Sequence, residues 1–211
     1  MDLGQWIVIG LSALMGVWYG VASFYNRRRG VATYYWLRDG LNSQGKISEA
    51  AWIGSSGSGA RLVVGKAGAP FKRIEVVFLL ESREILPLWL FNRFRRKLDE
   101  MILKADLRSM PSQEIEVTRS SERITLELMT GAQASRSEQT EAPAGLTITL
   151  RGGKDEDMLR RLSDFLDRYG TAIKRISLQK KSPHLMVHAE LPVLRVGEAE
   201  NFLAALSEIF A

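Results

Sequence analysis

The chain opens with a long apolar stretch, and no charged residue occurs from Leu3 to Asn26. A helix rises about 1.5 Å per residue, so this stretch is long enough to cross the hydrocarbon core of a bilayer, which is about 30 Å thick. Trp6 lies near one end of the stretch, and Trp18 and Tyr25 lie near the other, as aromatic residues do at membrane interfaces. The pattern predicts one membrane-spanning helix.

Three arginines, Arg27, Arg28 and Arg29, follow the apolar stretch, and only Met1 and Asp2 precede it. Basic flanks stay on the cytoplasmic side, so we expect the N-terminus to be outside or lumenal and the chain after residue 29 to be cytoplasmic. The alternative is a cleaved signal peptide. Signal peptides usually have a basic beginning and an apolar run of about 7–15 residues, so the pattern favours a retained anchor.

Gly16 and Gly20 form a small-xxx-small pair within the anchor. Small residues at this spacing let two membrane helices approach closely, which predicts contact with a membrane-protein partner. Glycine is also common in membrane helices without such a role.

Beyond the anchor, short segments of alternating or branched residues indicate strands. These strands are expected over 48–53, 61–64, 72–81, 100–108, 113–118, 123–129, 146–150, 173–178 and 185–191. Spacing near 3.6 predicts helices over 31–42, within 82–100, over 154–169 with Gly170 as the C-terminal cap, and over 198–210. A steady alternation of strand and helix is missing. The fold class expected is therefore α+β, with a largely antiparallel sheet and helices packed on it.

The domain organisation follows from these patterns. Residues 1–29 form the anchor with its basic flank, and residues 30–130 form a cytoplasmic α+β lobe. Residues 131–145 contain no large apolar side chain and are expected to be a flexible loop. Residues 146–211 form a βαββα lobe of the same domain.

Composition narrows the chemistry. The 211 residues include no Cys and two His, which excludes disulfides, thiolate nucleophiles and Cys-based metal sites. No phosphate-binding loop, nucleophile elbow or metal-binding motif is present, and His184 and His188 flank an apparent strand. We therefore expect no catalytic residues, no metal and no cofactor, and a protein that is not an enzyme. The net charge is +5, and the part of the chain after residue 26 carries 29 − 23 = +6, which suits an anionic partner.

The most informative stretch is ILPLWLFNRFRRK at 85–97. Its apolar members are Leu86, Leu88, Trp89, Leu90, Phe91 and Phe94, and its basic members are Arg93, Arg95, Arg96 and Lys97. Aromatic rings followed by cations suit a bilayer interface, with the rings at headgroup depth and the cations on phosphates. A core helix with a basic solvated end fits the same residues. The sequence leaves contact with the membrane, contact with a membrane partner and burial in the core open.

Basic residues mixed with aromatic residues also occur where proteins bind single-stranded nucleic acid. No RNA-binding signature accompanies them here, so we expect no sequence-specific nucleic acid. Contact with the backbone of ribosomal RNA would need only charge.

The layout resembles the calumin family, whose members pair with Asterix in the PAT complex. The likeness spans most of residues 3–210 and lies in the order and character of its segments. They are the anchor with VATYYWLRDGLNSQGKISEAAWIG, then IEVVFLLESREILPLWLFNRF, then DEMILKADLRSMP, then MLRRLSDFLDRYGTAIKRISLQ with HLMVHAELP and EAENFLAALSEIF.

The resemblance implies a membrane-anchored cofactor of membrane-protein biogenesis, beside an Asterix-like partner, the translocon and the ribosome. The family's acidic lumenal segment and basic coiled-coil tail have no counterpart in this sequence. Calcium binding is therefore not carried over, and direct ribosome contact loses its support. An accessory subunit of another membrane complex would have the same anchor, and an enzyme acting at the membrane is a third alternative.

Overall fold

The computed structural model describes residues 2–95, 97–119, 138–152 and 155–210. The helices are α1 (Leu3–Gln44), α2 (Leu86–Phe94), the 3-10 turn η1 (Pro143–Gly145), α4 (Glu156–Tyr169), α5 (Leu191–Leu194) and α6 (Ala199–Glu208). The strands are β1 (Ile47–Trp52), β2 (Gly59–Val64), β3 (Phe71–Leu79), β4 (Glu100–Leu107), β5 (Gln113–Arg119), β6 (Glu138–Ala142), β7 (Leu146–Gly152), β8 (Ile173–Leu178) and β9 (Leu185–Glu190).

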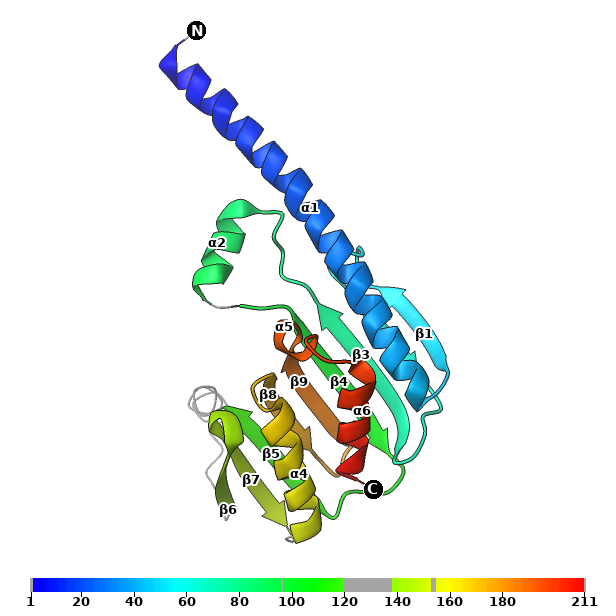
Figure 1. Cartoon of the computed structure of the whole chain (residues 1–211). Coiled ribbons are helices and arrows are strands. Elements are labelled where there is room, and N and C mark those ends of the chain that lie inside the picture. Colours follow the sequence, from blue (N-terminus) through cyan, green and yellow to red (C-terminus); the bar gives the residue numbers. More distant parts are fainter. Residues whose placement is uncertain (1, 96, 120–137, 153–154, 211) are drawn as a thin grey trace.

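These strands form one antiparallel sheet in the order β1-β2-β3-β4-β9-β8-β5-β7-β6 (Figure 1). The α+β class with a largely antiparallel sheet is thereby confirmed. Strand β5 precedes the expected loop at 131–145, yet it pairs with β7 and β8, which follow that loop. The strands on both sides of the loop therefore belong to one continuous sheet.

The structure corrects part of the loop itself. Residues 138–142 form β6, which pairs with β7 from Glu138↔Leu150 to Ala142↔Leu146. No local pattern predicted this strand, because its residues are polar or small and it lies at the edge of the sheet. The strand expected at 123–129 and residues 131–137 lie outside the described residues.

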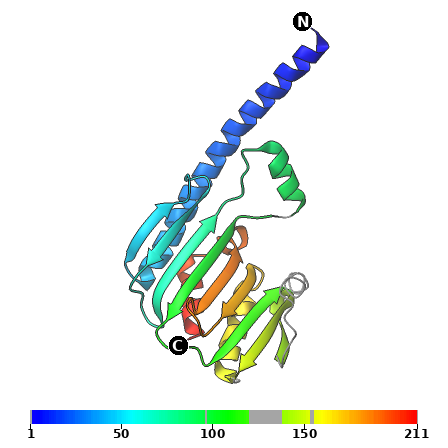
Figure 2. The same cartoon turned by 180° about the vertical axis from the view of Figure 1, so that it is seen from behind.

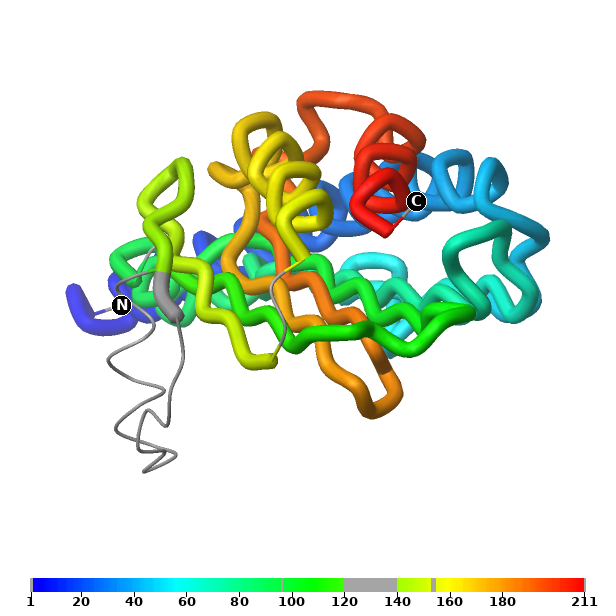
Figure 3. Tube along the Cα trace, turned by 90° about the horizontal axis from the view of Figure 1, so that it is seen from below, coloured from blue at the N-terminus to red at the C-terminus, as the bar shows by residue number. Residues whose placement is uncertain are grey.

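Helices α1, α4 and α6 cover one face of the sheet and leave the other face open (Figure 3). Alternate residues of several strands enter the core on the covered face. In β4, for example, Met101, Leu103, Ala105 and Leu107 are buried and the residues between them are not. The open face carries charged side chains, as antiparallel sheets commonly do when one face meets water.

Helix α1 is continuous over 42 residues. The separate short helix expected at 31–42 is therefore wrong: these residues belong to the second half of α1, the helix whose first half is the apolar stretch. One stripe of this half is buried and consists of Ala22, Asn26, Gly30, Thr33, Leu37, Gly40 and Leu41. The spacing of about 3.6 residues keeps this stripe on one side, so the anchor and the domain share a single rigid helix.

Candidate functional site

The first half of α1 projects beyond the domain and packs against almost nothing (Figure 1). Burial begins at Ala22, and residues 3–21 span about 28 Å at 1.5 Å per residue. This length matches the hydrocarbon core of a bilayer. In the part of the chain that the structure describes, α1 is the one helix long and apolar enough to cross a membrane. The chain thus carries a single candidate membrane span near its N-terminus.

Helix α2 lies beside α1 at the end of the sheet from which the span projects, and it connects β3 to β4 (Figures 1 and 2). None of its residues is buried. Leu88, Leu90 and Phe91 are exposed, and the Phe94 side chain is 86% exposed. Of the alternatives that the sequence left open, the core helix is therefore wrong. The helix is held out of the core as a short apolar surface.

Two tryptophans join α2 to α1 near the end of the candidate span that adjoins the domain. The ring centroids of Trp18 and Trp89 are 5.1 Å apart. Trp18 also donates its indole N–H to the carbonyl oxygen of Arg83, at 2.9 Å. Aromatic pairs at this separation attract each other beyond the area that they bury. Trp18 therefore links the span both to α2 and to the segment that leads into it.

A buried polar group fixes this arrangement, and we name Asn26, Arg29, Glu81, Arg83 and Asp99 the junction cluster. The Asp99 carboxylate is fully buried. It accepts hydrogen bonds from the Arg83 guanidinium at 3.0 and 3.1 Å and from the Glu81 backbone N–H at 2.8 Å. The Arg29 Nε lies 2.6 Å from its second oxygen. Both oxygens of the buried carboxylate therefore have donors, and these charge-assisted hydrogen bonds connect Arg29 of α1 to the segments on either side of α2.

Asn26 completes the junction cluster from the side of α1. Its side-chain oxygen accepts from Arg83 at 2.9 Å, and its amide nitrogen donates to the carbonyl oxygen of Glu81 at 2.9 Å. Asn26 and Arg29 lie one turn apart on the helix, whereas Glu81, Arg83 and Asp99 flank α2. The junction cluster thus ties both ends of the α2 connection to one turn of α1.

The same low-dielectric environment shifts the pKa values of two groups near Asp99, namely Glu81 and Arg195. Burial raises the pKa of the Glu81 carboxyl above its usual range, Arg83 opposes this rise and Asp99 adds to it. Burial lowers the pKa of Arg195, and the positive charge of Arg29 lowers it further. One oxygen of Glu81 and the Nε of Arg195 have no hydrogen-bond partner within the described residues. The surroundings of Asp99 are therefore costly to rearrange.

The residues that the sequence singled out divide into groups. Gly16 and Gly20 lie on the projecting half of α1, where an added Cβ would meet nothing within 4 Å. Arg27 and Arg28 are exposed, but Arg29 is drawn into the junction cluster, a role that its place in a run of arginines did not indicate. On the α2 side, Leu86 and Trp89 are half-buried, and Arg93, Arg95 and Lys97 are exposed. Arg96 lies outside the described residues.

Sequence reasoning missed Asn26, Arg83 and Asp99. A signal for Asn26 existed, because an amide at the end of an apolar helix needs hydrogen-bond partners once the helix is packed. No local pattern distinguishes Asp99 from its neighbour Glu100. Asp99 faces the helices and Glu100 faces the open side of the sheet, and this difference depends on tertiary structure.

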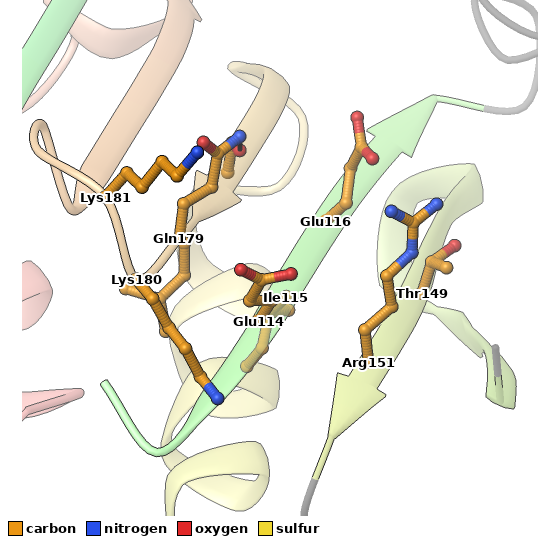
Figure 4. Close-up of a pocket in the computed structure, with 10 residues that line it drawn as sticks. Glu114, Ile115, Glu116, Thr149, Arg151, Gln179, Lys180 and Lys181 are labelled. Atoms are coloured by element: carbon orange, nitrogen blue, oxygen red, sulfur yellow. Dashed lines mark hydrogen bonds between the residues drawn. The ribbon is translucent and has the colours of Figure 1, made fainter. Parts of the chain in front are cut away.

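A pocket of about 500 Å³ lies on the open face, near the hairpin between β8 and β9 and away from α2 (Figure 4). Glu114, Glu116, Arg151, Lys180 and Lys181 line it, so its charges are mixed. Within the described residues, no three His, Asp or Glu side chains lie close enough together to hold a metal ion. His184 accepts from the Leu107 N–H at 3.1 Å, and His188 lies 3.0 Å from Glu100.

The fold and the junction cluster define an α+β protein that has, within the described residues, one candidate membrane span with an apolar helix beside it. Comparison with family models finds no match, and neither does comparison with curated proteins.

Glu100 makes the stability of this end of the sheet depend on pH. Hydrogen bonds from His188 and Lys174 lower the pKa of its carboxyl from 4.5 to about 2, against the opposing effect of burial. The stabilisation is therefore complete above about pH 5 and is lost as the pH falls toward 2. We expect Glu100→Gln to cost about 2 kcal/mol at pH 7 after allowance for solvent screening, and to lose less stability than the wild type between pH 5 and 2.

Unfolding of the full-length protein in detergent, followed at pH 7, 5, 4 and 3, measures this effect. Glu49→Gln is the matched control, because it removes an exposed carboxylate from the same face and also leaves an arginine, Arg61, without that partner. Parallel pH profiles for Glu100→Gln and the wild type would contradict the prediction.

Proposed function

We propose that the protein is a membrane-anchored, non-enzymatic cofactor of membrane-protein biogenesis, an intramembrane chaperone or translocon-associated factor. The observation that carries the proposal is α2, an apolar helix with no buried residue, held beside a candidate membrane span by the junction cluster. A buried charge network is costly to form, and here it keeps an apolar helix outside the core. Exposed apolar surfaces of this kind mark sites of contact with a protein or a membrane.

The expected use is contact with membrane helices that have not yet assembled. Polar groups in the hydrocarbon core lack water, and each unsatisfied group is costly until a partner helix arrives. The exposed side of α2 and the projecting half of α1 together offer an apolar surface with aromatic rings at the interface. A surface of this kind can shelter such a helix next to the bilayer.

The proposed orientation has the N-terminus outside or lumenal and the domain in the cytoplasm. Arg27, Arg28, Arg93, Arg95 and Lys97 support it, because all five cations lie on the domain side of the span. In this orientation α2 contacts the cytoplasmic leaflet. An Asterix-like membrane protein would pack on Gly16 and Gly20, and the translocon, with the ribosome bound to it, would lie nearby.

We expect the triple variant Trp89→Ser, Phe91→Ser, Phe94→Ser to reduce correct insertion of a multipass client by about half or more. The reason is that hydroxyl groups replace the apolar surface that would shelter the client. Insertion is measured by protease protection of the client in cells that depend on the variant. The sheet and its core should stay folded, since none of the three side chains is buried in the core. Trp89→Ser also removes the contact with Trp18, so the double variant Phe91→Ser, Phe94→Ser, which keeps that contact, should lower insertion as well.

The matched control is Met110→Ser with Val196→Ser, which removes exposed apolar side chains outside α2. Its insertion level should equal that of the wild type. Normal insertion by the triple variant, at normal abundance, would refute the proposed role of α2.

A stable accessory subunit of another membrane complex is the second candidate. The open surface at Gly16 and Gly20 favours it equally, because close helix packing serves permanent assembly as well as transient contact. The two candidate functions predict different co-purifying proteins after extraction in mild detergent. A chaperone carries varied multipass clients, whereas an accessory subunit carries one fixed set of partners.

A further inference from the structure

Five cations at the end of the domain nearest the span form no ion pair with another described residue. They are Arg27 and Arg28 of α1 and, in the segment that ends and follows α2, Arg93, Arg95 and Lys97. All five are exposed, and the structure shows no ion pair for any of them within its described residues. The acidic residues of the junction cluster are buried and pair with Arg29 and Arg83 instead. The two segments therefore present unbalanced positive charge on the same side of the span.

Apolar rings lie among these cations. Phe94, whose side chain is 86% exposed, stands between Arg93 and Arg95 in the sequence. The Arg95 guanidinium carbon lies 4.6 Å from the centre of the Phe91 ring. The rings of Trp18 and Trp89 contact each other. Helix α2 lies beside α1 at the end of the domain from which the candidate span projects (Figure 2). Rings and cations are thus combined at the depth where a bilayer changes from acyl chains to phosphates.

We propose that this surface binds the headgroups of anionic phospholipids in the leaflet on the domain side. The inference rests on the membrane placement in the proposed function and adds the chemical class of the ligand. Cations near an anionic membrane surface each contribute to binding, and two separate segments can contact several headgroups at once. A lipid surface suits the site better than RNA does, since RNA in water would leave Leu90, Phe91 and Phe94 exposed to solvent.

The experiment reconstitutes the full-length protein in bilayers of phosphatidylcholine that contain spin-labelled phosphatidylglycerol or spin-labelled phosphatidylcholine. The fraction of labelled lipid immobilised by the protein gives the relative association of the two headgroups. We expect phosphatidylglycerol to be preferred about fivefold or more at low salt, and the preference to shrink at 1 M salt because the cations are then screened.

Two charge-removal variants test the site from its two segments. Arg93→Gln with Arg95→Gln and Lys97→Gln, and separately Arg27→Gln with Arg28→Gln, should each lower the preference by about threefold or more. The matched control, Arg151→Gln with Lys180→Gln and Lys181→Gln, also removes three cations. Its residues lie at the pocket on the open face (Figure 4) and the preference should stay unchanged.

An equal association of the two lipids in the wild type would overturn the inference, as would an equal loss in the control variant. Salt-sensitive retention of poly(U) RNA by the same five cations, with no lipid preference, would assign the surface to nucleic acid instead. The assay contains no client protein. A failed lipid preference is therefore distinguishable from a failed chaperone function, which the insertion assay reports.

Discussion

Asp99→Asn is expected to destabilise the protein by about 3–5 kcal/mol, because it removes the fully buried anion that two half-buried arginines share. The Asp99 carboxylate accepts from Arg83 through both oxygens and pairs with Arg29. An asparagine of the same shape offers one acceptor, and its amide N–H groups point donors at donors. The Glu81 backbone N–H competes for the remaining oxygen. Arg29 then loses its counter-charge in a half-buried place, and Arg83 keeps only Glu81, at 3.6 Å.

Asp99→Asn is also expected to act locally, on the position of α2. The junction cluster connects α1 to both ends of the α2 connection, so α2 should lose its fixed position before the sheet unfolds. The sequence contains no Cys, so two introduced cysteines can be spin-labelled without removing any native residue. Spin labels at Tyr19→Cys and Leu90→Cys, both exposed positions, should give a narrow distance distribution in the wild type and a broad one in Asp99→Asn.

Glu49→Gln again serves as the control, since it removes an ion-pair partner of Arg61 at an exposed position. Its cost should stay below about 1 kcal/mol, as is usual for surface pairs. If Asp99→Asn cost no more than this control, the junction cluster would not be what positions α2, and the tryptophan pair would remain as the main connection.

The comparison of sequence and structure separates local information from long-range information. Helix α4 could be predicted almost in full, because its apolar stripe, its cap Asp155 and the closing Gly170 lie within one short segment. Strand β4 alternates in the sequence as it alternates in the core. In contrast, the strands that pair with β5, namely β7 and β8, come later in the chain. No pattern within the residues of β5 predicts which strands will pair with it.

The candidate site shows the same division. The apolar and basic residues of α2 could be recognised by composition. Whether α2 lies in the core or at the surface could not be predicted, because its position depends on where β3 ends and where β4 begins. Arg29 illustrates the difficulty most clearly. Its neighbours Arg27 and Arg28 remain exposed while Arg29 turns inward, and the helical phase that decides this is set by Asn26 and Gly30 on the packed stripe.

Gly30→Leu is expected to destabilise the protein by about 3 kcal/mol, although leucine forms helices better than glycine. A Cβ at position 30 would meet the backbone carbonyl of Ser56, and its next contact would be the Leu80 side chain at 3.3 Å. A backbone group cannot rotate away, so the loop between β1 and β2 has to leave the helix. The cost of overpacking then exceeds the gain in helix propensity of less than about 1 kcal/mol. Unfolding of the full-length protein in detergent measures the difference.

Gly20→Leu is the matched control on the same helix, because an added Cβ at position 20 meets nothing within 4 Å. It should leave the unfolding free energy of the isolated protein unchanged within about 0.5 kcal/mol. If a membrane partner packs on Gly16 and Gly20, the same variant should lose that partner during purification, since a leucine prevents close approach of the two helices. Gly30→Leu as stable as the wild type would contradict the packing of the loop on α1. The pair of variants therefore separates the glycines that build the domain from those that are free to contact another protein.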